Sequence, residues 1–270
     1  MKKTLFIIFS VIIASAISGC GSNGIVSEEN TAVTEVSNTE NINDPIATND
    51  IVHADGPTTG TLNGHEWVDL GLPSGTKWAT CNIGATKSEE FGDYFAWGET
   101  KPKELYDWTT YSYCNGSWNS LTKYSIEDGY HGDYPVSDFI DDLEILEDSD
   151  DAATVNWGKG WRMPTLEEIS ELAVWQKYGG SCSTTCLSLN GVNGRLFTGP
   201  NGNSIFIPAA GYIERDTLHD VGSQCCCWSK ELYENRHTRA WSLDFKFYSE
   251  ECGYGWWPRL FGFTIRPVCN

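Results

Sequence analysis

The Trp and Tyr residues of this chain are confined to one part of it. All 12 Trp and all 12 Tyr lie within residues 58–270, whereas residues 21–57 contain no aromatic residue, no Lys, no Arg and no Cys. Seven acids and many Thr, Ser and Asn residues occupy that earlier segment. Such a composition buries too little apolar surface to offset the conformational entropy of folding. We therefore predict an acidic disordered linker at residues 20–57 and a single folded domain at residues 58–270.

The first twenty residues predict export and lipid attachment. A short basic start precedes an apolar run at residues 5–17, which ends in Ile17-Ser18-Gly19-Cys20. This ending resembles the bacterial lipobox, in which the Cys is lipidated and becomes the mature N-terminus. We predict a lipoprotein signal peptide at residues 1–19 and an acyl anchor on Cys20, each buried methylene contributing about 0.8 kcal/mol to membrane binding. An ordinary secretory signal with a chance Cys is the alternative.

The net charge of the chain argues against one class of partner, and its hydropathy argues against a membrane span. Lys and Arg total 18 and Asp and Glu total 37, giving a net charge of -19, which argues against a nucleic-acid partner. No apolar run reaches the 18 residues of a membrane span. The expected location is therefore the outer membrane or the cell surface, through the lipid anchor.

Two hairpins and further strands are predicted from alternation and turn residues. Residues 66–70 and 76–81 flank a Gly- and Pro-containing turn, and residues 195–198 and 204–207 flank a turn with Asn-Gly. Residues 240–245 and 263–266 are expected to be strands as well.

The best helix signal follows Pro164. Thr165 and Glu168 form a capping box, an apolar stripe continues to Ala173, and Gly179 can end the helix. A shorter helix is predicted at residues 150–155, where acids favour the first turn. The fold class expected is α+β: short antiparallel strands, long loops and one or two helices.

An acidic run at residues 138–151 raises the question of calcium. It carries eight acids and no base. Asp148, Ser149, Asp150 and Asp151 have oxygens that calcium prefers, but the fuller Asp-rich loop pattern with its Gly is absent. Helix capping and a solvated face explain these acids more simply, so no metal and no cofactor are expected.

Five segments together resemble the Fibrobacter succinogenes major paralogous domain family. They read GHEWVDLGLPSGTKWA at 64–79, NWGKGWRMPT at 156–165, NGVNG at 190–194, PAAGY at 208–212 and IRPV at 265–268. The resemblance implies a C-type-lectin-like α+β domain, whose first and last strands pair and whose long loops present a ligand surface. It supplies no catalytic residues. The chain departs from the family at residues 224–229, where three consecutive Cys precede Trp-Ser.

Nine cysteines remain after Cys20, and this odd number leaves at least one thiol unpaired within the chain. Disulfides are expected from the number of cysteines and the exported location, and Cys182 and Cys186 are close enough in sequence to close a small loop. For the run of Cys225, Cys226 and Cys227 we expect one or two of the thiols to be disulfide partners and a remaining thiol to be buried. A soft-metal site is the alternative, but adjacent strand residues point to opposite faces.

No catalytic constellation is visible. The five His show no i, i+4 pair, and neither Gly-x-Ser-x-Gly nor a phosphate loop occurs. We therefore expect no enzyme. A formylglycine-generating-type thiol oxidase, suggested only by kinship of fold, remains an alternative.

Residues 228–261 are the predicted ligand surface because Trp and Tyr faces stack on sugar rings and Arg bonds hydroxyls. The candidate residues are Arg236, Arg239, Trp256, Trp257 and Arg259. A loop is expected at Trp256-Trp257, between Gly255 and Pro258, with at least one indole exposed and Arg259 at the rim. Burial in the core is the alternative for Trp228 and Trp241.

These features predict a surface lipoprotein with a non-catalytic, adhesin-like domain that recognises a glycan or a surface protein. A structural part of a surface assembly, such as a pilus tip, is the alternative.

Overall fold

The computed structural model describes residues 58–126, 139–173 and 180–270. The chain divides into two units, Met1–Ile51 and Val52–Asn270, and every described residue lies in the second unit. Cys20 and Gly179 therefore lie outside the described residues. No helix among the described residues is long and apolar enough to cross a membrane.

The first sheet joins the two ends of the domain. It contains β1 (Thr59–Leu62), β2 (His65–Asp69), β3 (Lys77–Ala79) and β12 (Val268–Cys269), in the order β1-β2-β3-β12. The antiparallel β2–β3 pair confirms the first predicted hairpin. The last strand pairs with β3, while β1 lies at the opposite edge, so the expected pairing of first and last strands is wrong in detail. Trp78 faces both Val68 and Val268 and is completely buried, which fixes the register.

The second sheet is an antiparallel meander of β4 (Ser183–Leu189), β5 (Val192–Thr198) and β6 (Ser204–Pro208). The β5–β6 pair confirms the second predicted hairpin. A two-residue turn links β4 to β5, with φ of 49° at Asn190 and 85° at Gly191. Two consecutive positive φ angles are the requirement of a type I′ turn, which Asn-Gly meets at low cost.

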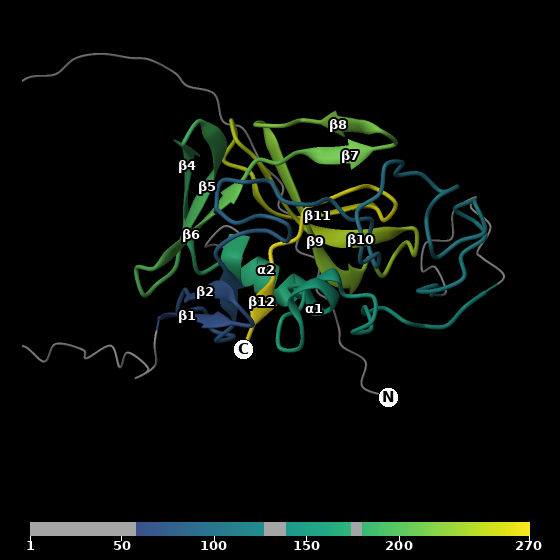
Figure 1. Cartoon of the computed structure of the whole chain (residues 1–270), viewed down its shortest axis with the longest axis horizontal. Helices are drawn as coiled ribbons and strands as arrows, with labels where there is room; N and C mark the ends of the chain where they lie inside the picture. Colours follow the sequence, from purple (N-terminus) through teal and green to yellow (C-terminus); the bar gives the residue numbers. More distant parts are fainter. Residues whose placement is uncertain (1–57, 127–138, 174–179) are drawn as a thin grey trace, which may run out of the picture. The chain divides into compact units, whose positions relative to one another are not determined.

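The third sheet consists of β9 (Gln224–Leu232), β10 (Arg239–Lys246) and β11 (Cys252–Pro258), in the order β11-β10-β9. A hairpin of β7 (Tyr212–Glu214) and β8 (Thr217–His219) lies above this sheet in Figure 1. The predicted strand at 240–245 is confirmed in β10. The strand predicted at 263–266 is wrong: Phe263 and Thr264 make only isolated bridges, to Phe95 and Cys227.

Both predicted helices are present and both are short. α1 (Ala152–Trp157) begins at Asp151, whose carboxylate accepts hydrogen bonds from the backbone of Ala153 and Thr154. α2 (Leu166–Ala173) has the predicted capping box, since Thr165 N donates to Glu168 and Glu168 N donates to Thr165 Oγ1. Capping thus accounts for Asp151 of the acidic run.

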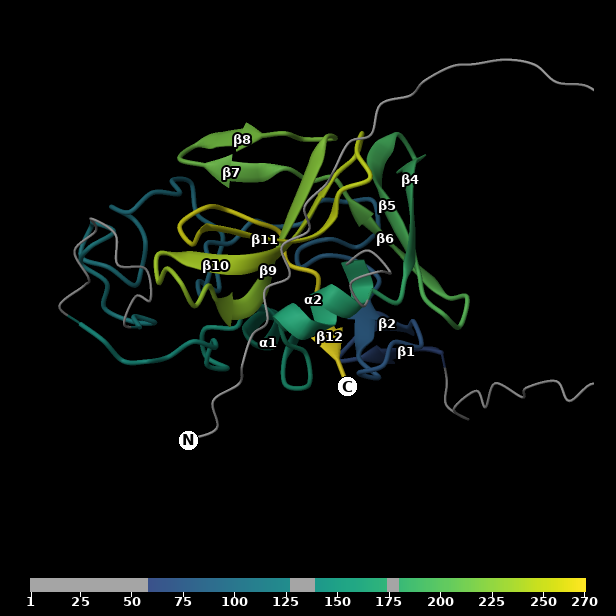
Figure 2. The same cartoon turned by 180° about the vertical axis from the view of Figure 1, so that it is seen from behind.

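The third sheet separates two hydrophobic cores, as the alternation along β9 shows. Cys226 and Trp228 enter one core, with Trp97 and Trp161, whereas Cys225 and Cys227 enter the other. The second core is covered by α2 and by the β4–β6 sheet, which Figure 2 shows from behind. The described domain is therefore built mostly of antiparallel sheets with two short helices, an α+β or mostly β architecture.

Candidate functional site

A group of aromatic side chains lies on one face of the third sheet, at the end where β10 begins and β11 ends. We call it the aromatic shelf, and it consists of Tyr233, Arg239, Trp241, Tyr254 and Trp256. Trp241 of β10 and Trp256 of β11 are directly opposite in the register, so they share a face. Arg239 and Tyr254 lie two positions from Trp241 and Trp256, and the two-residue period of a strand puts them on that face as well.

The rings of the shelf support one another. Tyr233 stacks on Trp256 with centroids 5.2 Å apart and planes 11° from parallel. Trp241 meets Tyr233 and Tyr254 edge-on, at 4.9 Å and 5.4 Å. The Arg239 guanidinium lies 4.4 Å from the centre of the Trp256 ring, a cation–π contact. These contacts hold the rings in fixed orientations.

The shelf is open to solvent although it continues a buried face. Leu243 and Phe245 of β10 occupy the same face and are buried in the core beneath α2. Beyond them Trp256 is 43% exposed and Tyr254 is 48% exposed. Trp241 is half-buried, and its indole N–H donates to Glu234 at 3.0 Å. The surface therefore offers large apolar rings with an Arg and a Glu beside them.

The structure corrects the predicted loop at Trp256-Trp257. Both residues belong to β11, where consecutive side chains point to opposite faces. Trp257 is half-buried on the other face, 5.4 Å from Tyr212 by ring centroids, and its indole N–H donates to Asp244. The expectation that at least one of the two indoles is exposed is confirmed by Trp256. Trp257 does not share a surface with Trp256.

The prediction that Arg259 lies at the rim of the ligand surface is wrong. This side chain is completely buried, and its guanidinium donates to the backbone carbonyls of Lys123, Tyr124 and His237. Pro258 is the last residue of β11, and the chain then turns inward to meet those carbonyls. Arg259 ties three chain segments together inside the domain.

Of the other candidates, Arg236 lies in the connection between β9 and β10, and Arg239 is the first residue of β10. Arg236 N donates to Tyr233 O and Arg239 N donates to Arg236 O. These two hydrogen bonds fix the turn that joins Tyr233 to Arg239. Arg239 joins the shelf, three residues after Arg236. The structure thus brings together Arg239 and Trp256 of the five ligand-binding candidates and places Trp257 and Arg259 elsewhere.

Three further shelf residues lie within the predicted ligand surface at residues 228–261 but outside the five candidates, namely Tyr233, Trp241 and Tyr254. A usable signal was present in the sequence. Tyr254 and Trp256 alternate with Gly253 and Gly255, the pattern of a strand with one bulky face. A strand at residues 252–258 joins Tyr254 to Trp256 on one face and excludes Trp257.

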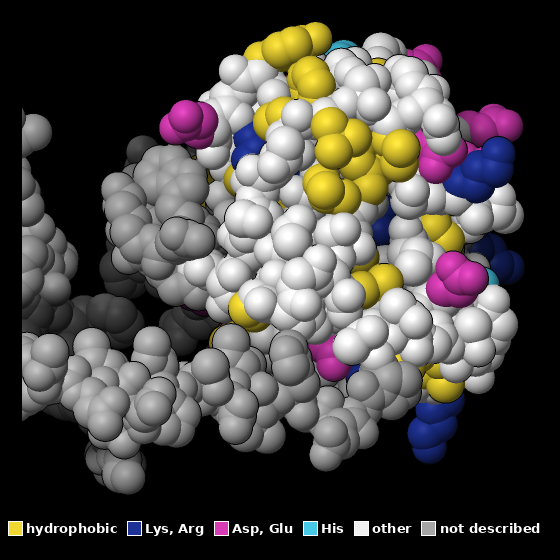
Figure 3. Space-filling model, turned by 90° about the vertical axis from the view of Figure 1, so that its left-hand side faces the viewer, with side chains coloured by type: hydrophobic (Ala, Val, Ile, Leu, Met, Phe, Trp, Pro, Cys, Tyr) yellow, Lys and Arg dark blue, Asp and Glu magenta, His cyan; other side chains and the backbone are white. Residues whose placement is uncertain are grey.

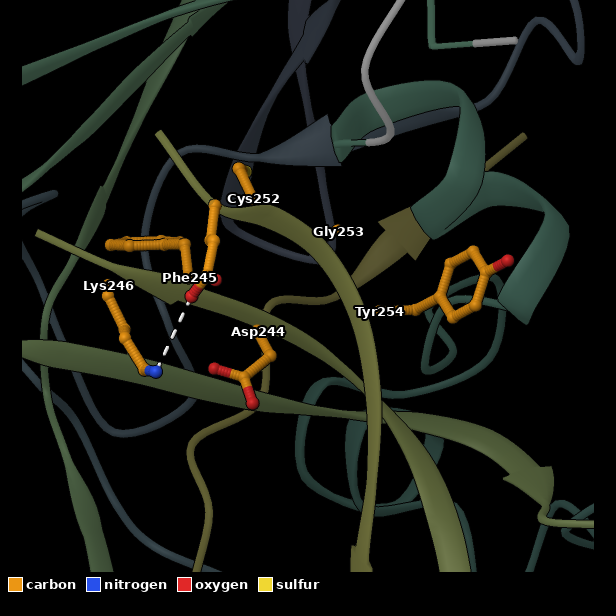
Figure 4. Close-up of a pocket in the computed structure, with 7 residues that line it drawn as sticks. Asp244, Phe245, Lys246, Cys252, Gly253 and Tyr254 are labelled. Atoms are coloured by element: carbon orange, nitrogen blue, oxygen red, sulfur yellow. Dashed lines mark ion pairs between the residues drawn. The ribbon is translucent and has the colours of Figure 1, made fainter. Parts of the chain in front are cut away.

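A pocket of about 250 Å³ adjoins Tyr254 at the edge of the same sheet (Figure 4). Asp244 lines it, and its carboxylate accepts hydrogen bonds of 3.0 Å from both Trp257 Nε1 and Gln224 Nε2. Burial raises the pKa of this carboxyl because its hydrogen bonds only partly offset the lost hydration. Lys246 and Glu251 form an ion pair of 3.4 Å at the rim. The pocket is polar and small, and its acid Asp244 lies beside Trp257 on the face of the sheet opposite the shelf.

A second pocket, of about 390 Å³, lies among residues 98–113 and Asp150. Its acid Glu99 accepts hydrogen bonds from Lys103 and from the backbone and hydroxyl of Ser112. Asp150 is held by Lys123 and by the Tyr124 hydroxyl. These partners explain both acids as structural groups that fix a long loop.

The cysteines are all free in the described part of the chain, so the expected disulfides are not formed there. Cys182 is buried and Cys186 exposed, and four residues of extended chain hold their Cα atoms roughly 13 Å apart, too far for a disulfide. The sulfurs of Cys225 and Cys227 lie 3.5 Å apart on one side of β9, and Cys226 points to the other side. Among the described residues, no group of three or more His, Cys, Asp or Glu side chains could hold a metal ion.

Comparison with models of protein families, with curated proteins and with solved structures found no match for this chain.

Proposed function

We propose that this chain is a lipid-anchored surface protein whose domain binds a glycan through the aromatic shelf, without catalysis. The observation that carries the proposal is the pair Tyr254 and Trp256, two half-exposed rings held on one face of a strand. Their Cα atoms are separated by two strand residues, roughly 7 Å. Rings at that spacing present successive apolar surfaces to the faces of a sugar chain, and Arg239 and Glu234 lie beside them to bond hydroxyls.

The sequence features support a location outside the cell for this surface. The lipobox at Cys20 would fix the chain to a bilayer, and the acidic linker would let the domain move away from it. An extended linker of 37 residues reaches on the order of 120 Å. In this proposal the domain has the C-type-lectin-like fold, which the five family-like segments and the antiparallel sheets with two short helices support.

A glycan array probed with the Cys20→Ala chain tests the proposal. We expect at least one glycan to bind, and Trp256→Ala and Tyr254→Ala each to weaken that binding at least about thirtyfold, the scale of an interface hot spot. Tyr248→Ala is the matched control, because Tyr248 is 81% exposed and lies outside the shelf.

The results separate this proposal from its rivals. Silence across the array with a folded domain, or equal loss in the Tyr248 and Trp256 variants, would count against glycan binding at the shelf. If a surface protein binds instead, and the shelf variants abolish that binding, then the ligand is a protein. Membrane fractionation of the Cys20→Ala chain checks the anchor, since the variant should move to the soluble fraction.

A further inference from the structure

Among the described residues, β4 is a long strand at the edge of its sheet. β4 is the first strand in the order β4-β5-β6 and has seven residues, Ser183–Leu189. Its sequence, STTCLSL, contains no charged residue and no Pro. Folded proteins normally protect such an edge with charges, Pro, bulges or a covering segment, because unpaired N–H and C=O groups pair with any available strand.

The backbone groups that point outward follow from the hairpin register. Leu189 and Val192 flank a two-residue turn, so they form a pair that exchanges both ladder hydrogen bonds. The ladder alternates, and the N–H and C=O groups of Thr184, Cys186 and Ser188 therefore point away from β5. No described residue makes a hydrogen bond to these outward backbone groups. The edge thus presents three donors and three acceptors.

The position of Cys186 gives this edge a two-fold character. Cys186 is the middle residue of β4 and is exposed, with three strand residues on either side. An antiparallel partner of the same sequence would place Cys186 opposite its own counterpart, and Thr184 opposite Ser188. Such a self-complementary patch is the requirement of a two-fold dimer.

Charge and apolar surface also fit a second copy. The chain carries a net charge of -19, yet no charge lies on β4, so two copies meet there without direct like-charge contact. Leu187 and Leu189 of β4 and Leu196 of β5 are half-buried on the outer face of this sheet. Figure 3 shows hydrophobic side chains gathered in a patch on this side of the domain. Pairing would continue that apolar strip across the two-fold axis.

We propose that β4 pairs antiparallel with β4 of a second copy, about a two-fold axis at Cys186, to form a six-stranded sheet. The facing Cys186 residues would form a hydrogen-bonded pair with Cα atoms about 5.5 Å apart. That separation lies within the range of a disulfide, so Cys186 can report the pairing. The dimer is independent of the proposed ligand, since the shelf lies on a different sheet.

Oxidative crosslinking of the full-length chain tests the register. With copper–phenanthroline, two Cys186 thiols lose two protons and two electrons, which the copper passes to dioxygen, and a dimer should appear on a non-reducing gel. On a Cys186→Ser background, a mixture of Thr184→Cys and Ser188→Cys chains should crosslink, whereas either chain alone should not. Crosslinks without this register dependence would overturn the two-fold pairing, as would capture of Cys186 in an intrachain disulfide.

Sedimentation tests the same pairing without covalent chemistry. Thr185→Lys adds a charge on exposed β4 and should weaken dimerisation at least tenfold, whereas Ser204→Lys, on the opposite edge strand β6, should leave it unchanged. A wild-type chain that stays monomeric at all concentrations would refute the proposal. Because glycan binding is measured on the shelf, monomers that still bind would show that only the dimer has failed.

Discussion

The indole N–H of Trp257 donates a 3.0 Å hydrogen bond to the Asp244 carboxylate, across the pair of strands that also carries the shelf on its opposite face. The second carboxylate oxygen accepts from the Gln224 amide, so both direct donors are neutral. Lys246 lowers and Glu251 raises the pKa of Asp244, but burial is the largest influence and the net shift is upward. A half-buried acid therefore supports the strand whose opposite face we propose as the binding surface.

Asp244→Asn should make the domain more stable relative to the wild type as pH rises. A carboxyl with a raised folded-state pKa binds its proton more tightly when folded, so its contribution to stability falls as pH rises from about 3.8 through the folded pKa. The amide cannot ionise and avoids that loss. Urea unfolding at pH 4 and pH 7 measures the difference. Asp216→Asn, at an exposed site, is the control, and a difference that does not change with pH would contradict the prediction.

Arg259→Met should lower the free energy of unfolding by about 3 kcal/mol or more. The substitution leaves the buried carbonyls of Lys123, Tyr124 and His237 without their donors, and each unsatisfied group costs about 1–3 kcal/mol. Arg215→Met, whose side chain is 71% exposed, should change stability by no more than about 0.5 kcal/mol. Equal denaturant midpoints for the two variants would show that the buried guanidinium is dispensable.

Glu168→Gln should destabilise the domain at neutral pH and lose this effect in acid. Burial alone would raise the pKa of Glu168, but hydrogen bonds from Arg162, Thr76 and Thr165 outweigh it and the net shift is downward. The carboxylate therefore contributes stability above about pH 4.5, which is lost as pH falls through the folded pKa. We expect about 1.5–3 kcal/mol at pH 7, the value of a charge-assisted hydrogen bond. Exposed Glu167→Gln is the control, and a penalty that persists at pH 3 would argue against linkage to this carboxylate.

Cys186 should be the thiol that reacts fastest in the dilute native protein. Burial raises the pKa of Cys182 and of Cys252 to about 12, which leaves almost no thiolate at pH 7.5. Cys225, Cys226 and Cys227 are completely buried. Labelling followed by peptide mass spectrometry checks the order, and Cys186→Ser should remove the fast phase. Rapid modification of the three consecutive cysteines would mean that β9 opens readily.

Local signals in the sequence predicted the local structure. The Thr165–Glu168 capping box and the turns between alternating segments depend on residues a few positions apart, and the structure contains them. The cap of α1 at Asp151 also follows from a short-range preference for acids at helix starts.

The direction of the side chains at the site could not be predicted from neighbouring residues, because it depends on strand order and on contacts with distant segments. Pro258 indicated a loop because Pro cannot donate to a central ladder, but β11 is an edge strand and Pro258 is its last residue, where Pro is tolerated. The predicted loop put Trp256 and Trp257 on one surface, whereas the observed strand points them to opposite faces. Arg259 is buried, and its guanidinium donates to carbonyls of residues 123, 124 and 237. No pattern of residues near position 259 predicts partners so distant in the sequence.

The first sheet contains both β1 and β12, so it can be completed only when the last residues of the chain are available. Arg266 donates to the carbonyl of Ala79, 187 positions earlier, and β12 pairs with β3 two residues further along. A chain that becomes available N-terminus first holds β3 without β12 until residues 266–269 follow. Contacts of such long sequence separation form slowly, because a large loop must close before they stabilise anything. Until then the early strands remain open and prone to aggregation, so the interval before the last strand arrives is the most vulnerable stage of folding.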